Sequence, residues 1–265
     1  MIYWRDQGSG EPVLFIHAFP LNGAMWDAQL AGLPPGWRGI APDLRGFGQS
    51  AGDGDGPYTM DLFADDLAAL LDHLRLDHAV VCGLSMGGYV ALAFYRKYAM
   101  RVRALVLCNT RAGADSEEGK QNRRALAHRV RLDGARAAIE SVMPKIVSEH
   151  TRRTEPGRVV AAHGLMESNQ PEALARALEG MALRPDSEPM LRHIEVPTLI
   201  VHGEDDATIP PGEGQIMARG IRGSRIKILT QSGHLSNLEN PDGFNRVLGE
   251  FLQQLPPWFG VLKFA

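Results

Sequence analysis

The stretch Ala79-Val80-Val81-Cys82-Gly83-Leu84-Ser85-Met86-Gly87-Gly88 decides the fold. Its first four residues form an apolar run, typical of a strand buried on both faces. Its second half matches the pattern G-x-S-x-G, and a helical pattern follows from residue 86 to 98. A turn between a strand and a helix lifts the hydroxyl of Ser85 above the sheet, and Gly83 and Gly87 leave room where the two elements approach. The pattern predicts Ser85 as a nucleophile, and the alternative is a glycine-rich turn without chemistry.

The same alternation of apolar runs and helical patterns continues on both sides of this stretch. Thr59 is expected to cap a helix whose apolar positions run from Phe63 to Leu74, and a closing helix is expected over residues 244–255. Further strands are expected at residues 12–17, 37–42, 104–108, 197–202 and 225–229. This rhythm predicts an α/β fold with a mainly parallel central sheet flanked by helices.

Between residues 111 and 190 the strand rhythm stops. Helices are expected there at residues 120–132, 135–147, 157–168 and 171–183. Asn169 and Glu172 predict a capping box for the last of them, with Pro171 in its first turn. We interpret residues 111–190 as a helical lid inserted late in the chain, between two parts of one core at residues 1–110 and 191–255. A helical decoration without a gating role is the alternative.

A serine nucleophile needs a general base, and the base needs an orienting group. Where the serine sits on such a turn, the chain order is Ser, then Asp or Glu, then His. His234 follows the last expected strand and precedes the closing helix, so it is the expected base. The acid should follow the strand that ends near residue 202, where Asp206 is favoured and Asp205 is the alternative.

The oxyanion that develops during acyl transfer needs preorganised N–H donors. We expect one donor to be the backbone N–H of Met86, which follows the nucleophile, and the other to be the N–H of Phe19, after the first expected strand. Pro20 cannot donate and stiffens the same loop. His17 and His202, at strand ends, are expected to have structural roles.

Composition limits the class of partner. The 265-residue chain has a net charge of −3, so no basic field points to nucleic acid. Cys82 and Cys108 lie inside expected strands and are interpreted as buried free thiols. Residues 1–10 carry no apolar leader and no run approaches the roughly 18 apolar residues of a membrane span, so a cytoplasmic protein without membrane attachment is expected. The apolar tail at residues 256–265 leaves three roles open: packing on the body, a homodimer contact, or an appended segment.

Taken together, these residues resemble α/β-hydrolase-fold serine esterases and lactonases over nearly the full length. The segments 17–22 and 25–27 look like the oxyanion loop and following helix of bacterial esterases and cofactor-free haloperoxidases, and residues 43–50 match the pattern D-x-R-G-x-G-x-S, which we interpret as structural. Residues 82–88, 107–110 and 234–239 together look like 3-oxoadipate enol-lactonases. The resemblance implies a small ester or lactone substrate and no cofactor or metal.

Three departures from the family pattern matter. Ala18 replaces the glycine usual after the oxyanion-loop histidine, which could narrow or twist that loop. The chain begins close to its first expected strand at Tyr3-Trp4-Arg5, which favours seven strands over eight. An enol-lactone substrate is anionic, so a cationic side chain of residues 111–190 would be expected to point towards it. The numbers of basic and acidic residues in this segment are nearly equal, so its composition does not show whether such a side chain is present.

Other functions remain open at this level. Acyl transfer to peroxide (perhydrolysis) and hydrolysis of a carbon–carbon bond use the same triad, and a ligand receptor could retain the same fold. A metal hydrolase built on His17, His202, Asp205 and His234 has no H-E-x-x-H spacing to support it. A histidine base predicts activity that rises with pH through about 6.5.

Overall fold

The computed structural model describes residues 2–258 and has a seven-stranded sheet among them. Its strands are β1 (Trp4–Gly8), β2 (Glu11–Ile16), β3 (Trp37–Pro42), β4 (Ala79–Leu84), β5 (Val102–Cys108), β6 (Thr198–Gly203) and β7 (Arg225–Leu229). The order across the sheet is β1-β3-β2-β4-β5-β6-β7; β1 runs antiparallel to β3 and the other pairs are parallel. The α/β fold and the seven strands are as predicted. The carboxyl ends of the six parallel strands therefore meet at one edge.

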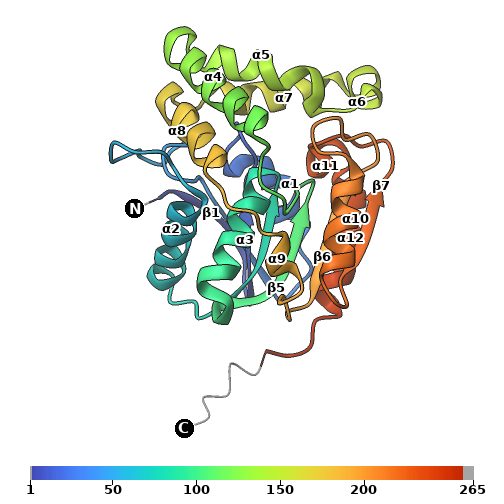
Figure 1. Cartoon of the computed structure of the whole chain (residues 1–265). Helices are drawn as coiled ribbons and strands as arrows, with labels where there is room; N and C mark the ends of the chain where they lie inside the picture. The colour runs from blue at the N-terminus through green and yellow to red at the C-terminus, as the bar shows by residue number, and fades with distance from the viewer. Residues whose placement is uncertain (1, 259–265) are drawn as a thin grey trace.

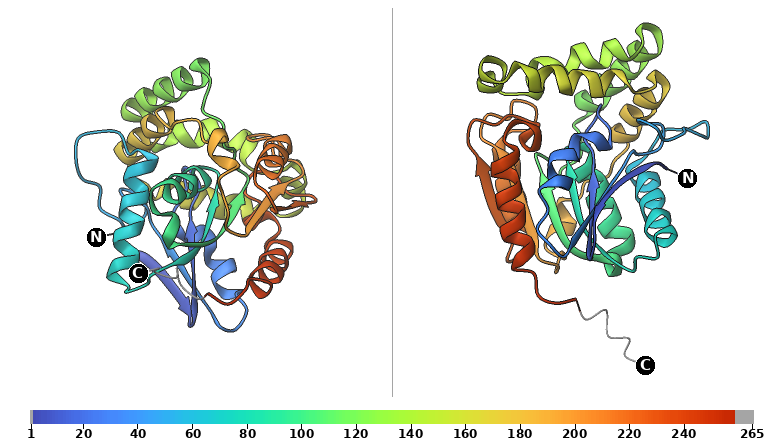
Figure 2. Two further views of the ribbon diagram at one scale, coloured as in Figure 1. Left: turned by 60° about the horizontal axis from the view of Figure 1, so that its bottom comes forward. Right: turned by 180° about the vertical axis from the view of Figure 1, so that it is seen from behind.

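Helices cover both faces of the sheet (Figures 1 and 2). One face is covered by α2 (Met60–His73), α3 (Met86–Tyr98) and α10 (Pro211–Gly220), and the other by α1 (Asp27–Ala31) and α12 (Pro241–Gln253). Phe63 and Phe94 are buried in the first layer, and Trp26 and Phe244 in the second. The Thr59 hydroxyl accepts from the N–H of Leu62 at 3.1 Å, which confirms the expected cap of α2. Short helical segments lie at η1 (Gly23–Trp26), η2 (Ala99–Arg101), α9 (Glu188–Leu191) and α11 (Ser236–Glu239).

Five helices lie above the carboxyl edge of the sheet, at the top of Figure 1. They are α4 (Glu117–Asp133), α5 (Ala135–Ile146), α6 (Glu149–Thr154), α7 (Pro156–Glu167) and α8 (Pro171–Ala182). We call residues 111–190 the helical insertion. α8 lies close to the core, because a Cβ atom on Gly180 would come within 1.7 Å of the carbonyl oxygen of Tyr58. The position of these helices puts the insertion over the edge where the strand ends meet.

The capping box expected at Asn169 is wrong. Helix α8 begins after Gln170 and has no side-chain cap. Instead, the amide oxygen of Asn169 accepts from the N–H of Gly48, and its amide nitrogen donates to the carbonyl oxygen of Pro20, both at 2.7 Å. Asn169 is buried, and buried backbone groups need partners, so bonds to two core loops replace the local cap. Asn169 thereby links the insertion to the loop that contains Phe19.

Three remaining predictions concern cysteines, membranes and the tail. Cys82 and Cys108 are free and buried, as expected. Within residues 2–258 no helix combines the length and apolar character that crossing a membrane requires. Residues 259–265 of the tail lie outside the described residues. Trp258 stacks on His78 with ring centroids 4.6 Å apart, so the described start of the tail packs on the core.

Candidate active site

Ser85 lies at the turn from β4 to α3, with φ 57° and ψ −114°. This left-handed region is strained for a residue with a side chain and costs about 1–3 kcal/mol. A Cβ atom on Gly83 would lie 2.1 Å from the carbonyl oxygen of Gly87, and one on Gly87 would lie 2.1 Å from that of Ile16. The turn therefore requires glycine at both positions. The N–H of Ser85 donates to the carbonyl oxygen of Cys108 at 2.9 Å, which holds the strained turn against β5.

A chain of hydrogen bonds joins the three residues expected to form the triad. The Ser85 hydroxyl lies 2.8 Å from Nε2 of His234, and Nδ1 of His234 lies 2.8 Å from Oδ2 of Asp206. Because an ionised carboxylate can only accept, Nδ1 carries the proton and Nε2 is free to accept from the serine. Ser85 is 9% exposed, His234 2% and Asp206 5%. This geometry suits a serine nucleophile with a histidine base.

Asp206 is held in its ionised form. Burial alone would raise the pKa of its carboxyl group, but the neighbouring His234 and hydrogen bonds from Asn109 and Ile209 outweigh burial and lower the pKa below its usual value. Oδ1 accepts from the N–H groups of Thr208 and Ile209, each at 2.9 Å. Asp205, the alternative acid, is exposed. The structure thus places Asp206 beside the histidine.

The other two strand-end histidines serve the loops. Nε2 of His17 accepts from the N–H of Leu44 at 3.0 Å, so Nδ1 carries the proton and donates to the carbonyl oxygen of Ala18 at 3.0 Å. Burial lowers the pKa of His17 to about 4. Nε2 of His202 donates to the carbonyl oxygen of Ile209 at 2.8 Å. Among residues 2–258 no group of three or more His, Cys, Asp or Glu side chains gathers as a metal site.

A cavity of about 170 Å³ lies in front of Ser85 and His234, between the core and the helical insertion. Its core side, which we call the floor, is lined by Phe19, Ser85, Tyr89, Thr208, Ile209 and His234. Its insertion side, which we call the roof, is lined by Arg111, Arg123, Ser141, Val142, Lys145, Ile146 and Met181. The hydrogen bonds among residues 2–258 leave the N–H groups of Phe19 and Met86 without an acceptor. Within these residues, neither amide has a partner that an incoming acceptor would have to displace.

Two arginines of the roof belong to a cluster that sequence reasoning missed. Arg111, Arg123 and Arg184 all contact Asp115, whose side chain is 2% exposed. Burial opposes ionisation of Asp115, but hydrogen bonds and charge from Arg123 and Arg184 lower its pKa to about 2. Three guanidinium groups on one carboxylate leave an excess of positive charge, and Lys145 adds another cation to the cavity wall. The spacing of Arg111 and Asp115, four residues apart just after a strand, is the one local signal of this cluster.

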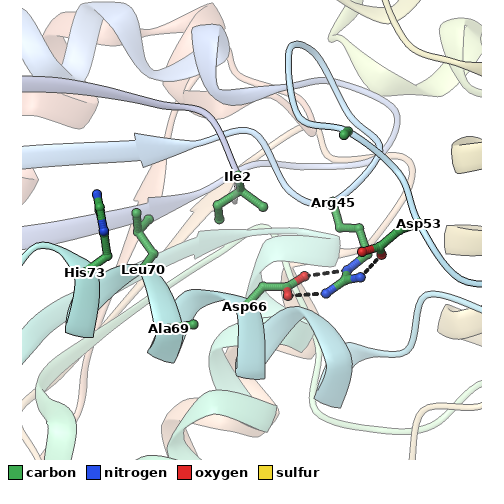
Figure 3. Close-up of a pocket in the computed structure, with 8 residues that line it drawn as sticks. Ile2, Arg45, Asp53, Asp66, Ala69, Leu70 and His73 are labelled. Atoms are coloured by element: carbon green, nitrogen blue, oxygen red, sulfur yellow. Dashed lines mark hydrogen bonds and ion pairs between the residues drawn. The ribbon is translucent and has the colours of Figure 1, made fainter.

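A larger cavity of about 380 Å³ lies elsewhere, beside α2 (Figure 3). Its charged side chains satisfy one another: Arg45 pairs with Asp66, at 2.8 Å from Nε to Oδ2, and with Asp53. Arg45 belongs to the segment 43–50 that we interpreted as structural, and Asp43 of that segment accepts from the N–H of Gly23 at 2.8 Å. Neither Ser85 nor His234 lines this cavity, so the cavity in front of Ser85 is the candidate active site.

Comparison with known proteins agrees with this architecture. The family model for the alpha/beta hydrolase fold matches residues 11–241, and the chain belongs to that family. A thermophilic esterase from Thermogutta terrifontis, solved with malate bound, is 44% identical with a TM-score of 0.94, covering 96% of this chain and 93% of that one. An enol-lactonase from Burkholderia xenovorans is 29% identical with a TM-score of 0.88, covering 96% of each chain.

Among curated proteins, 3-oxoadipate enol-lactonase 2 of Acinetobacter baylyi is 28% identical over 244 residues, which is 91% of this chain and 88% of the relative. The resemblance to esterases and enol-lactonases is therefore shown by both sequence and structure. The chain is a hydrolase of the α/β fold with esterase-like and lactonase-like relatives.

Proposed function

We propose that this protein is a serine hydrolase that cleaves a small carboxylic ester or lactone through an acyl-enzyme. The observation that carries the proposal is the unbroken hydrogen-bond chain from Ser85 through His234 to Asp206, with both links at 2.8 Å. The esterase and enol-lactonase relatives support the same class. The cavity of about 170 Å³ is smaller than the roughly 300–1,000 Å³ of common ligand sites, which favours a small substrate.

In the first half of the reaction Ser85 is acylated. Nε2 of His234 takes the hydroxyl proton while Oγ attacks the carbonyl carbon, and the negative charge moves to the carbonyl oxygen. The free N–H groups of Phe19 and Met86 bind that oxyanion. His234 then returns the proton to the departing alkoxide as the carbon–oxygen bond breaks. With a lactone, the alcohol that forms stays attached to the acyl group.

In the second half water attacks the acyl-enzyme and displaces Ser85. His234 takes a proton from water, the hydroxide attacks the acyl carbon, and Ser85 leaves with the proton that His234 returns. Asp206 keeps the imidazole in the tautomer that accepts at Nε2 and stabilises the imidazolium in both halves. Peroxide entering in place of water would give a peracid, so perhydrolysis remains an alternative outcome of the same machinery.

The test is hydrolysis of p-nitrophenyl acetate and butyrate by the wild type and by Ser85→Ala. We expect multiple turnover in the wild type and a fall in kcat of about 10⁴–10⁶ in the variant, because the variant lacks the attacking oxygen. A thermal melt of both proteins controls for folding. Activity of Ser85→Ala within tenfold of the wild type would contradict the proposal, and a single turnover by the wild type would favour the receptor alternative.

A second candidate is hydrolysis of an ester or lactone that itself carries a carboxylate. It is favoured by the excess of cationic side chains in the roof, where Arg111, Arg123 and Lys145 line the cavity. Guanidinium groups bind carboxylates through paired, charge-assisted hydrogen bonds. This candidate differs from the first in substrate charge and uses the same floor.

A further inference from the structure

Asn109 occupies a central position below the proposed triad. It follows β5, which lies between β4, the strand before Ser85, and β6, the strand before Asp206. Its φ of 44° is in the left-handed region, where Asn is tolerated better than most residues. Its side chain is fully buried, and its N–H donates to the carbonyl oxygen of Val201 at 2.9 Å. The backbone of Asn109 is thus fixed independently of the contacts of its side chain.

The contacts of the Asn109 amide determine its orientation. One end lies 2.8 Å from Oδ2 of Asp206 and 3.1 Å from the carbonyl oxygen of Gly233. A carboxylate and a carbonyl oxygen can only accept, so this end is the amide nitrogen with its two protons. The other end accepts from the hydroxyl of Ser236 at 2.5 Å. One side chain therefore bonds to Asp206 and to the residues on either side of His234 and Leu235.

The contact with Asp206 supplies a restraint that other groups do not. Oδ1 of Asp206 is already fixed by two backbone N–H groups, whereas Oδ2 is the oxygen to which His234 donates. His202 lies 3.5 Å from Oδ2, but its Nε2 donates to Ile209 at the shorter distance of 2.8 Å. Asn109 is therefore the neutral donor that holds Oδ2 in the direction of His234.

We propose that Asn109 is a positioning residue that fixes the carboxylate of Asp206 and the loop of His234 relative to each other, an inference that rests on the proposed function. Asn109 makes no hydrogen bond to Ser85 Oγ and is not among the residues that line the cavity. It acts through Asp206 and Gly233. Its loss should lower the rate of the chemical step and leave substrate binding nearly unchanged.

Several charged groups surround the base and bear on any pH profile. Asp206 lies beside it in the loop after β6, His202 lies near Asp206 within β6, and Glu239 accepts from the N–H of Leu235 at 3.1 Å. From the roof, Arg111, Arg123 and Lys145 line the same cavity. Variants at Asn109 leave all six in place, so a change in the profile reports on Asn109 itself.

The experiment compares Asn109→Gly and Asn109→Asp with Ser236→Ala. Glycine keeps the left-handed backbone and removes the amide; we expect kcat to fall about 10–100-fold with KM within about threefold, the scale of a lost hydrogen bond to a charged group. Aspartate keeps the shape, but two carboxyl groups this close share a proton, so residue 109 can donate to Asp206 only while that proton is bound. Loss of the shared proton as the pH rises should remove the restraint, so kcat/KM of this variant should have a pH dependence that the wild type lacks. Ser236→Ala removes only the partner of the amide oxygen and should stay within about threefold.

The outcomes separate this inference from the proposed function. Loss of ester turnover in Ser85→Ala establishes the serine mechanism independently of Asn109. If that loss is seen but Asn109→Gly keeps kcat within threefold, or a folded Asn109→Asp has the same pH profile as the wild type, the positioning role is overturned. If Asn109→Asp does not fold, the kcat and KM of Asn109→Gly decide. If the wild type hydrolyses no ester or lactone, the proposed function itself fails.

Discussion

The floor and the roof of the cavity are held together by different interactions. Ser85 and His234 of the floor, with Asp206 behind them, are at most 9% exposed and are joined by hydrogen bonds of 2.8 Å. In the roof, the side chains of Arg111 and Arg123 are 31% and 22% exposed and are held mainly by their charge pairing with Asp115. The hydrogen bonds fix the side chains of the floor in one arrangement, whereas the arginines of the roof can bind an anionic substrate as well as Asp115.

This difference assigns different tasks to the two walls. Preorganised donors and acceptors stabilise a transition state because they need no rearrangement when charge develops. Partly exposed guanidinium groups select among substrates by charge, since binding an anion adds to the ion pairs already made. We therefore expect changes in the floor to slow every substrate and changes in the roof to affect only some of them.

The largest effect should follow Asp206→Asn. The amide cannot hold the histidine tautomer that accepts from Ser85, so kcat should fall by about 10⁴, the loss seen when other triads lose this carboxylate. The measurement is kcat for methyl butyrate and for monomethyl succinate, followed in a pH-stat, with both substrates losing the same factor. Asp205→Asn, one residue away and exposed, is the matched control and should stay within about threefold of the wild type. If Asp206→Asn and Asp205→Asn lost the same factor in kcat, the role of orienting His234 could not be assigned to Asp206.

An intermediate effect should follow Arg111→Gln. One charge-assisted hydrogen bond to a carboxylate is worth about 1.5–3 kcal/mol, so KM for monomethyl succinate should rise about 10–100-fold while KM for methyl butyrate stays within about threefold. Arg136→Gln is the control, because Arg136 pairs with Glu140 on the exposed face of α5 and does not line the cavity. A rise of equal size for both substrates would mean that the roof acts through shape and not through charge.

The floor was largely predictable from sequence, because its signals are local. The continuous apolar runs predicted β2, β4, β5 and β6 to within two residues at each end. β3, β7 and α3 were predicted with their observed bounds. The G-x-S-x-G turn, the chain order and the G-x-x-D-x-x-x-P loop together selected Ser85, Asp206 and His234, which the structure joins by two hydrogen bonds. A strand buried on both faces has a pattern that few other structures produce.

The parts that sequence reasoning missed depend on long-range contacts or on weak local propensity. Helix α10 was not predicted because Gly212, Gly214 and Gly220 lower its helix propensity. Gly214 is required there by its neighbour, since a Cβ atom would lie 2.9 Å from Nδ1 of His202. The contact of Arg184 with Asp115 joins residues far apart in the chain, which no local pattern encodes.

The smallest effect should be on the pH dependence of stability. Burial lowers the pKa of His17 to about 4 from an ordinary value near 6.5 and also lowers that of His202. Between about pH 6.5 and 4 the unfolded chain therefore binds more protons than the folded one. The stabilisation from keeping His17 neutral is present above about pH 6.5 and is lost as the pH falls towards 4.

One histidine contributes a slope of at most about 1.4 kcal/mol per pH unit to the free energy of unfolding. In urea unfolding at pH 7, 6 and 5, the free energy of unfolding of the wild type should decrease as the pH is lowered, and that of His17→Gln should decrease less steeply. At pH 7 His17→Gln should be less stable than the wild type, because it loses the hydrogen bond from the N–H of Leu44. His150→Gln, on the exposed side of α6, should retain the slope of the wild type. If the free energies of unfolding of the wild type and His17→Gln change with pH in parallel, His17 titrates alike in the folded and unfolded chains. Burial of His17 would then contribute nothing to the pH dependence of stability.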